Sequence, residues 1–174
     1  MKLAILADIH SNASALAAVL SSAKKAEVDA LLIAGDLVGY YFDPRLVLRL
    51  IQSYEKPCYL VRGNHEDMLR KAKACRTQLD EISARYGPGI QIALDQLTDS
   101  EVEWISGLPH PLAINDLDCS ILLCHGSPFC IDEYVYPDCD IEDLLLSLNN
   151  PPRLLIMGHT HYPFVKTVDD CLVV

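Results

Sequence analysis

Short, nearly continuous apolar runs recur along the chain, and mostly polar stretches separate them. The five runs cover residues 2–7, 30–34, 58–61, 120–124 and 154–157. Each has the length of a β-strand, and continuous hydrophobicity is typical of strands in a sheet that is covered on both faces. The pattern therefore predicts five buried strands.

Helical patterns lie between these runs. Apolar side chains recur at helical spacing across residues 12–26, where Ser11 or Asn12 can cap the helix. Residues 43–54 form a second such pattern, and residues 98–108 open with a Thr and a Glu at capping-box spacing. Because strand and helix alternate, the predicted fold class is α/β.

The chain has the length of one domain, and no repeat or interdomain linker divides residues 1–174. Residues 67–97 look helical with a break at 86–89, so we expect a helical flank at about 67–118. Residues 163–174 read as two strands around a turn at Asp169-Asp170. We therefore predict a single domain with this flank on one side of its core.

The charge of the chain limits its partners. It has 14 Lys plus Arg against 24 Asp plus Glu, a formal charge of −10, which disfavours binding to duplex nucleic acid. An acidic protein can still act on phosphates if bound cations supply positive charge. No run is long enough to span a membrane, the N-terminus lacks a signal-peptide pattern, and the seven cysteines form no C-x-x-C. We expect a cytoplasmic protein with reduced thiols.

Residues that can bind a metal follow directly after each apolar run. In chain order they form the motifs Asp8-x-His10, Gly35-Asp36-x-x-Gly39, Gly63-Asn64-His65-Glu66, His125-Gly126 and Gly158-His159-Thr160-His161. Five of the six histidines therefore lie near the carboxyl end of a strand, where open α/β sheets place their ligand sites. This placement predicts a binding site at the strand ends.

The spacing within these motifs favours a metal site. Two-residue spacing on an extended segment points both side chains to one face, so Asp8 can converge with His10, and His159 with His161. The set holds too many donors for one tetrahedral zinc, but it suits two divalent ions that share a carboxylate. Each residue also has a simpler reading, as a turn residue, a helix cap or a surface imidazole beside a loop proline. The full series of five motifs favours the metal site.

The ordered series DIH, GDLVG, GNHE, HG and GHTH resembles the calcineurin-like metallophosphoesterases. The small bacterial and archaeal phosphodiesterase branch is most similar, because the chain also contains DIHSN and GDLVGY. The resemblance extends from Met1 to about Pro163. It implies a four-layer α/β/β/α sandwich that hydrolyses phosphodiester bonds with a hydroxide held between two divalent metal ions.

The resemblance also implies roles for individual residues. One ion would be held by Asp8, His10, Asp36 and His161, and the second by Asp36, Asn64, His125 and His159. His65 would be the catalytic residue, as general acid for the leaving oxygen or as a transition-state donor, with Glu66 or another carboxylate to orient it. Manganese is the expected metal, with iron, zinc, nickel or cobalt as alternatives. The expected substrate is a small phosphodiester or nucleotide.

The chain departs from related branches at two places. Protein phosphatases and symmetrical dinucleoside-tetraphosphate hydrolases continue the second motif with a phosphate-binding arginine, whereas Gly39-Tyr40-Tyr41 stands here, although Arg62 is kept. Arg62 could contact phosphate or form a structural ion pair, and the tyrosines could line the pocket or pack. Relatives also continue past the last hairpin, so we expect a chain that is naturally short or truncated.

Three questions stay open at this point. A phosphomonoesterase or nucleotide hydrolase could use the same residues, and a non-catalytic scaffold is a further alternative. The motifs do not distinguish these activities, because they specify the metal ligands and not the substrate. The oligomeric state is also undetermined.

Overall fold

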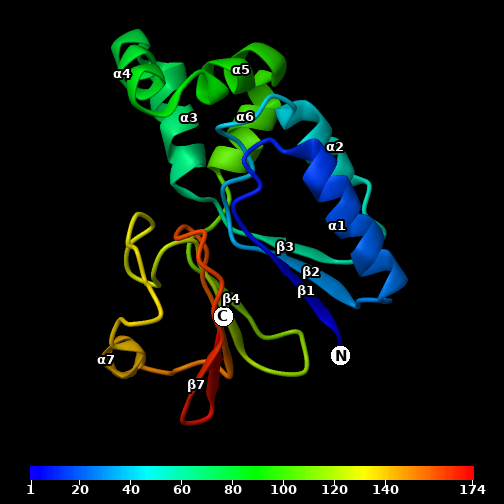
Figure 1. Cartoon of the computed structure of the whole chain (residues 1–174), viewed down its shortest axis with the longest axis vertical. Helices are drawn as coiled ribbons and strands as arrows, with labels where there is room; N and C mark the ends of the chain where they lie inside the picture. The colour runs from blue at the N-terminus through cyan, green and yellow to red at the C-terminus, as the bar shows by residue number, and fades with distance from the viewer.

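The computed structural model describes residues 1–174 and contains two sheets with helices on their outer faces (Figure 1). The first sheet is parallel, with the order β1 (Leu3–Leu6), β2 (Ala30–Ile33), β3 (Cys58–Leu60). Helices α1 (Ala13–Lys25) and α2 (Pro44–Gln52) connect these strands. Since right-handed crossovers between sequential strands put both helices on one face, the other face is left for the second sheet.

The ends of these helices follow from their sequence. The Asn12 side chain accepts a hydrogen bond from the backbone N–H of Ala15 at 3.0 Å, so Asn12 and not Ser11 caps α1. Pro44 occupies the first turn of α2, where no backbone N–H is needed. No helix of the structure combines the length and the hydrophobicity that a membrane span requires.

Four helices follow β3 and gather at one end of the molecule (Figure 1). They are α3 (Asn64–Ala74), α4 (Arg76–Tyr86), α5 (Gly89–Gln96) and α6 (Asp99–Ser106). The expected capping box opens α6, since Thr98 and Glu101 exchange hydrogen bonds. The helical flank is shorter than the predicted limit of about 118, because residues 112–114 pair with the second sheet as strand β4.

The second sheet has five strands in the order β4-β5-β6-β8-β7. They are β4 (Leu112–Ile114), β5 (Ile121–Leu123), β6 (Leu154–Ile156), β7 (Lys166–Val168) and β8 (Cys171–Val173). The hairpin β7–β8 confirms the turn predicted at Asp169-Asp170. Helix α7 (Ile141–Leu146), which the hydrophobic pattern did not reveal, packs on the outer face of this sheet.

Three buried clusters hold the four layers together, and alternate residues of the central strands supply them. In β2, Leu31 and Ile33 pack against the helices, whereas Leu32 belongs to the cluster between the two sheets. In β6, Ile156 faces the first sheet and Leu155 packs in the cluster with α7. Side chains of a strand alternate between its faces, so two covered faces require a continuously apolar run. The structure thus confirms the α/β class and the four-layer sandwich.

Candidate metal centre

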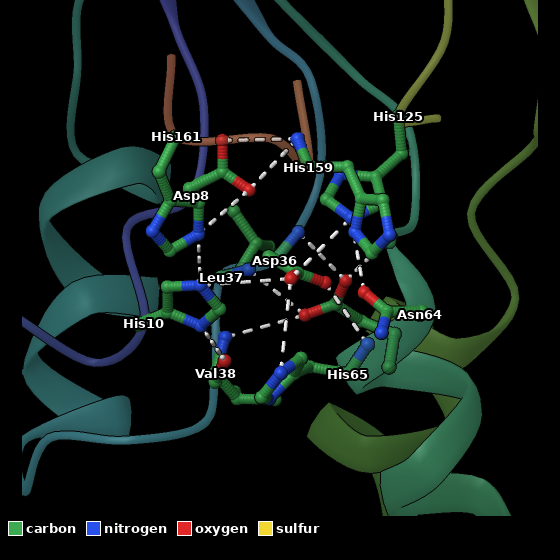
Figure 2. A network of polar contacts seen from close by, with 12 residues as sticks. Asp8, His10, Asp36, Leu37, Val38, Asn64, His65, His125, His159 and His161 are labelled. Carbon is green, nitrogen blue, oxygen red and sulfur yellow. Dashed lines mark hydrogen bonds and ion pairs between the residues drawn. The ribbon is translucent and has the colours of Figure 1, made fainter. Parts of the chain in front are cut away.

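Loops after five strands bring the predicted site residues together at one edge of the two sheets (Figure 2). The first sheet contributes Asp8, His10, Asp36, Asn64 and His65, and the second contributes His125, His159 and His161. All but two of these residues are buried; Asp8 is half-buried and His161 is exposed. The centre therefore lies across the junction of the two sheets.

The backbone at this centre is strained. Five of the converging residues adopt left-handed conformations, with φ between 48° and 71°: Asp8, His10, Asp36, His159 and His161. A non-glycine residue in this region costs on the order of 1–3 kcal/mol and persists only where its surroundings enforce it. Such strain gathers at functional sites, because it aims side chains at one point.

Asp8, His10 and His161 form the first group of potential ligands, with ligand atoms that all lie within 4.8 Å of one another. The Nε2 atoms of His10 and His161 are 3.1 Å apart, and His161 Nε2 lies 3.5 Å from a carboxylate oxygen of Asp8. His10 Nδ1 donates to the carbonyl of Val38 at 3.1 Å, which leaves the Nε2 lone pair facing the group. Burial lowers the pKa of His10 to about 4, so its imidazole is neutral, as a metal ligand must be.

The second group contains Asp36, His125 and His159. His125 Nδ1 donates to the carbonyl of Ala34 at 2.7 Å, so its Nε2 points toward Asp36 Oδ2 at 3.3 Å and Asn64 Oδ1 at 3.0 Å. The Nε2 atom of His159 is buried and has no hydrogen-bond partner. An unpaired buried nitrogen and converging lone pairs fit a cation at this position.

The charge of this second group agrees with that fit. Burial acts to lower the pKa of His125, but the hydrogen bond and charge of Asp36 outweigh it and raise the pKa to about 9. Burial acts to raise the pKa of Asp36, but the hydrogen bond from His125 outweighs it and lowers the pKa to about 2. In the metal-free chain these pKa shifts favour a protonated His125 beside an ionised Asp36, and a metal ion would supply that positive charge instead.

Asp36 connects the two groups, and together with His10 and His65 it also forms a third group of potential ligands. Its Oδ2 atom lies 3.6 Å from His10 Nε2 and 3.3 Å from His125 Nε2. Its Oδ1 accepts the backbone N–H of His65 at 2.9 Å, which fixes the orientation of the carboxylate. One carboxylate facing both groups is the arrangement that a bridging ligand requires.

His65 is nearly fully buried beside Asp36, with its Nε2 3.9 Å from Asp36 Oδ2. Its Nδ1 has no hydrogen-bond partner, and burial lowers its pKa. Gly39 has φ of 114°, and a Cβ at that position would overlap His65 Nδ1. The glycine that ends the GDLVG motif thus leaves space for the imidazole.

Glu66, one of the carboxylates expected to orient His65, makes no hydrogen bond to the His65 imidazole. Its carboxylate, which is fully buried, accepts four backbone N–H groups at 2.6–3.2 Å, those of Asp36, Leu37, Val38 and Gly63. Burial and the charge of Asp36 raise the pKa of Glu66 to about 7. Glu66 therefore braces the loop that carries Asp36. The Gly63-x-x-Glu66 spacing, which resembles a capping box, is the only sequence signal for this role.

A cavity of about 240 Å³ opens onto both groups. Tyr40, Tyr86 and Tyr134 line it together with all of the site residues except Asp8 and His125, whereas Tyr41 does not line it. No lysine or arginine lines this cavity. Arg62 is turned away, because its guanidinium donates to the carbonyl of Leu108 at 2.7 Å and lies 3.3 Å from Asp67. The structure thus assigns Arg62 to a structural ion pair.

Comparison with known proteins identifies the class of this centre. Residues 1–163 match the family model of the calcineurin-like phosphoesterases, and the chain belongs to that family. An uncharacterized protein of Methanocaldococcus jannaschii is 29% identical over 174 residues, which cover 98% of this chain and 67% of the relative. Membership supports metal-dependent phosphoester hydrolysis, and the His/Asp groups fit the divalent ions that it implies.

Solved structures confirm the fold. A hypothetical protein of Pyrococcus horikoshii has a TM-score of 0.86 at 20% identity, and the match covers 98% of this chain and 74% of that protein. An archaeal phosphodiesterase has a TM-score of 0.58 at 18% identity, with 100% of this chain and 82% of that protein covered. At these identities the likeness establishes the architecture alone.

Proposed function

We propose that the chain hydrolyses small phosphodiesters at a centre of two divalent ions. Asp8, His10 and His161 would hold one ion, while Asn64, His125 and His159 would hold the other, with Asp36 shared between them. The geometry that supports this assignment is the position of Asp36 Oδ2, 3.6 Å from His10 Nε2 and 3.3 Å from His125 Nε2. Bound ions supply Lewis acidity and lower the pKa of a bound water to about 7.

The residues of the chain would position the substrate and the departing group. His65 lines the cavity beside Asp36 and is the proposed general acid for the leaving oxygen. The tyrosines in the lining restrict the open volume around the phosphate. The buried Glu66 holds the backbone of the Asp36 loop in place through four hydrogen bonds.

The absence of a basic side chain from the cavity lining supports a diester in preference to a monoester. A diester has two non-bridging oxygens and one negative charge, so two ions can contact both oxygens. A monoester has a third such oxygen and a second charge, and this cavity offers neither lysine nor arginine to bind them.

The test is steady-state kinetics on metal-depleted protein reloaded with manganese. We expect a higher kcat/KM for bis-p-nitrophenyl phosphate than for p-nitrophenyl phosphate. Asp36→Ala, purified identically, should abolish turnover, which excludes a contaminating phosphatase. A preference for the monoester would replace the proposal with a phosphomonoesterase. No turnover with manganese, nickel, cobalt or zinc would refute hydrolysis, and elemental analysis would then show whether the chain is a metal-free scaffold.

A further inference from the structure

Two tyrosines form a ring pair on the loop between β5 and α7. Val135, which lies between Tyr134 and Tyr136 in the sequence, is buried in the cluster with Leu155 and Ile141. The two rings are nearly parallel, with centroids 6.0 Å apart and planes 12° from each other. The buried Val135 therefore fixes the segment that presents both rings.

The ring pair extends from the cavity to the surface. The Tyr134 ring lies 4.1 Å from the ring of His159, with the planes 37° apart, and it lines the cavity. Tyr136 pairs with Tyr134 and does not itself line the cavity. Tyr134 is 56% exposed and Tyr136 is 40% exposed, so the ring pair keeps accessible aromatic surface beside the cavity.

The hydroxyl groups of these two rings have no partner within the fold. Neither hydroxyl takes part in a hydrogen bond, in contrast to Tyr59, whose hydroxyl donates to Asp116 at 2.8 Å. Exposed parallel rings that lead to a polar site are the surface on which planar heterocycles stack, because every nucleobase offers an aromatic face. The ring pair is therefore suited to a flat aromatic group attached to the phosphate.

We propose that Tyr134 and Tyr136 bind the base of a small nucleotide diester, an inference that rests on the proposed function. With no lysine or arginine in the lining, stacking would add to the affinity that the two ions provide for the phosphate. The net charge of −10 disfavours a long polyanion, so a mononucleotide ester or short dinucleotide fits better than a polymer.

Two substrates with the same leaving group test this subsite: the p-nitrophenyl ester of thymidine 5′-monophosphate and methyl p-nitrophenyl phosphate. In both, the oxygen of water adds to phosphorus and p-nitrophenolate departs, so the substrates differ only in the group that stays on the phosphate, thymidine or methyl. Removing a ring under a base typically costs about 5- to 150-fold in binding. We expect Tyr136→Ala to lower kcat/KM for the thymidine ester by at least about 5-fold and to leave the methyl ester unchanged.

Two further variants separate stacking from loop damage. Tyr136→Phe keeps the ring and should behave like the unmodified chain. Phe129→Ala removes a more exposed ring of the same loop that is not part of the ring pair, and it should affect neither substrate. If Tyr136→Ala slows both esters equally, or leaves the thymidine ester unchanged, the subsite is refuted while the hydrolase proposal stands.

Calorimetric binding of thymidine 5′-monophosphate and methyl phosphate to the manganese-loaded protein decides the subsite even without turnover. Tighter binding of the thymidine compound that is lost in Tyr136→Ala would support the ring pair. Equal binding of both compounds would overturn it. If neither ester is hydrolysed, the proposed function fails, and the binding result still shows whether the rings recognise a base.

Discussion

Replacing Glu66 by Gln exchanges one oxygen of a fully buried side chain for an NH₂ group. Glu66 Oε1 accepts the N–H groups of Leu37 and Val38, and Oε2 accepts those of Asp36 and Gly63. A glutamine keeps one oxygen, so two backbone N–H groups would face another donor. The perturbation therefore removes acceptors without changing the size of the side chain.

The expected magnitude follows from these four hydrogen bonds. A buried donor that loses its acceptor costs about 1–3 kcal/mol, so two such groups cost about 2–6 kcal/mol. Removing a buried negative charge beside Asp36 offsets part of this cost, because that charge and burial already raise the pKa of Glu66 to about 7. We expect a net loss of about 1–4 kcal/mol in the free energy of unfolding, or about 2–16 °C in Tm for a chain of this length.

Thermal unfolding of the metal-free protein at pH 8.5 measures this loss, with Glu27→Gln as the control. Glu27 is exposed, and its carboxylate takes part in no hydrogen bond or ion pair, so its replacement should leave Tm unchanged. We also expect manganese affinity of Glu66→Gln to fall about 10-fold or more, since the loop of Asp36 loosens. Unchanged Tm and unchanged metal affinity would refute the bracing role.

Three further predictions concern the centre itself. His65→Ala should keep its metal, but its rate on a diester with a poor leaving group should fall about 100-fold or more. The rate on a p-nitrophenyl ester, whose leaving group needs less help from an acid, should fall less. If elemental analysis shows that the variant has lost its metal, His65 is a ligand instead. In the metal-free fold, the raised pKa of His125 gives stability that is complete below pH 6.5 and is lost as the pH rises through about 9. A metal ion must displace that proton, so the apparent metal affinity should rise between pH 6.5 and about 9. Calorimetry of metal binding in buffers of different ionisation enthalpy should show about one proton released at pH 7.5. The absence of proton release would contradict the displacement. Gly63→Ala should lower the free energy of unfolding by about 1–3 kcal/mol and weaken metal binding, because its Cβ would lie 2.6 Å from the backbone nitrogen of Asp36. An unchanged free energy of unfolding in denaturant would contradict this close packing.

The apolar pattern identified the elements that are long or covered on both faces. It predicted β2 and β6, because each strand contributes side chains to two buried clusters and is therefore apolar along its whole length. It also predicted the hairpin β7–β8 from its turn residues. It did not reveal β4, whose three residues become a strand only through antiparallel pairing with β5. It also missed α7, which has only six residues. Both depend on contacts with the second sheet, which local sequence does not encode.

The convergence of the candidate ligands could be predicted from the sequence for a physical reason. The strand ends bring Asp8 and His161 to one edge of the sheets, and in the proposed centre metal binding would constrain their identity. Glu66 acts through backbone N–H groups that any sequence would provide, so its partners leave no trace in residue types. Likewise, the Tyr134–Tyr136 pair depends on a loop whose conformation is fixed by the burial of Val135.

The position of the centre explains why the chain tolerates its strain. Two hydrogen bonds join the sheets at the centre. Asp8, which follows the first sheet, accepts the backbone N–H of His159 at 3.0 Å. His125, which follows the second sheet, donates to the carbonyl of Ala34 at 2.7 Å. These contacts lie above the apolar cluster that joins the sheets, so the packing of the layers fixes the left-handed loops. His159 and His161 fall in different ligand groups although only one residue separates them. In the proposed centre, His159 and His161 would therefore bind different ions and connect the second sheet to ligands supplied by the first.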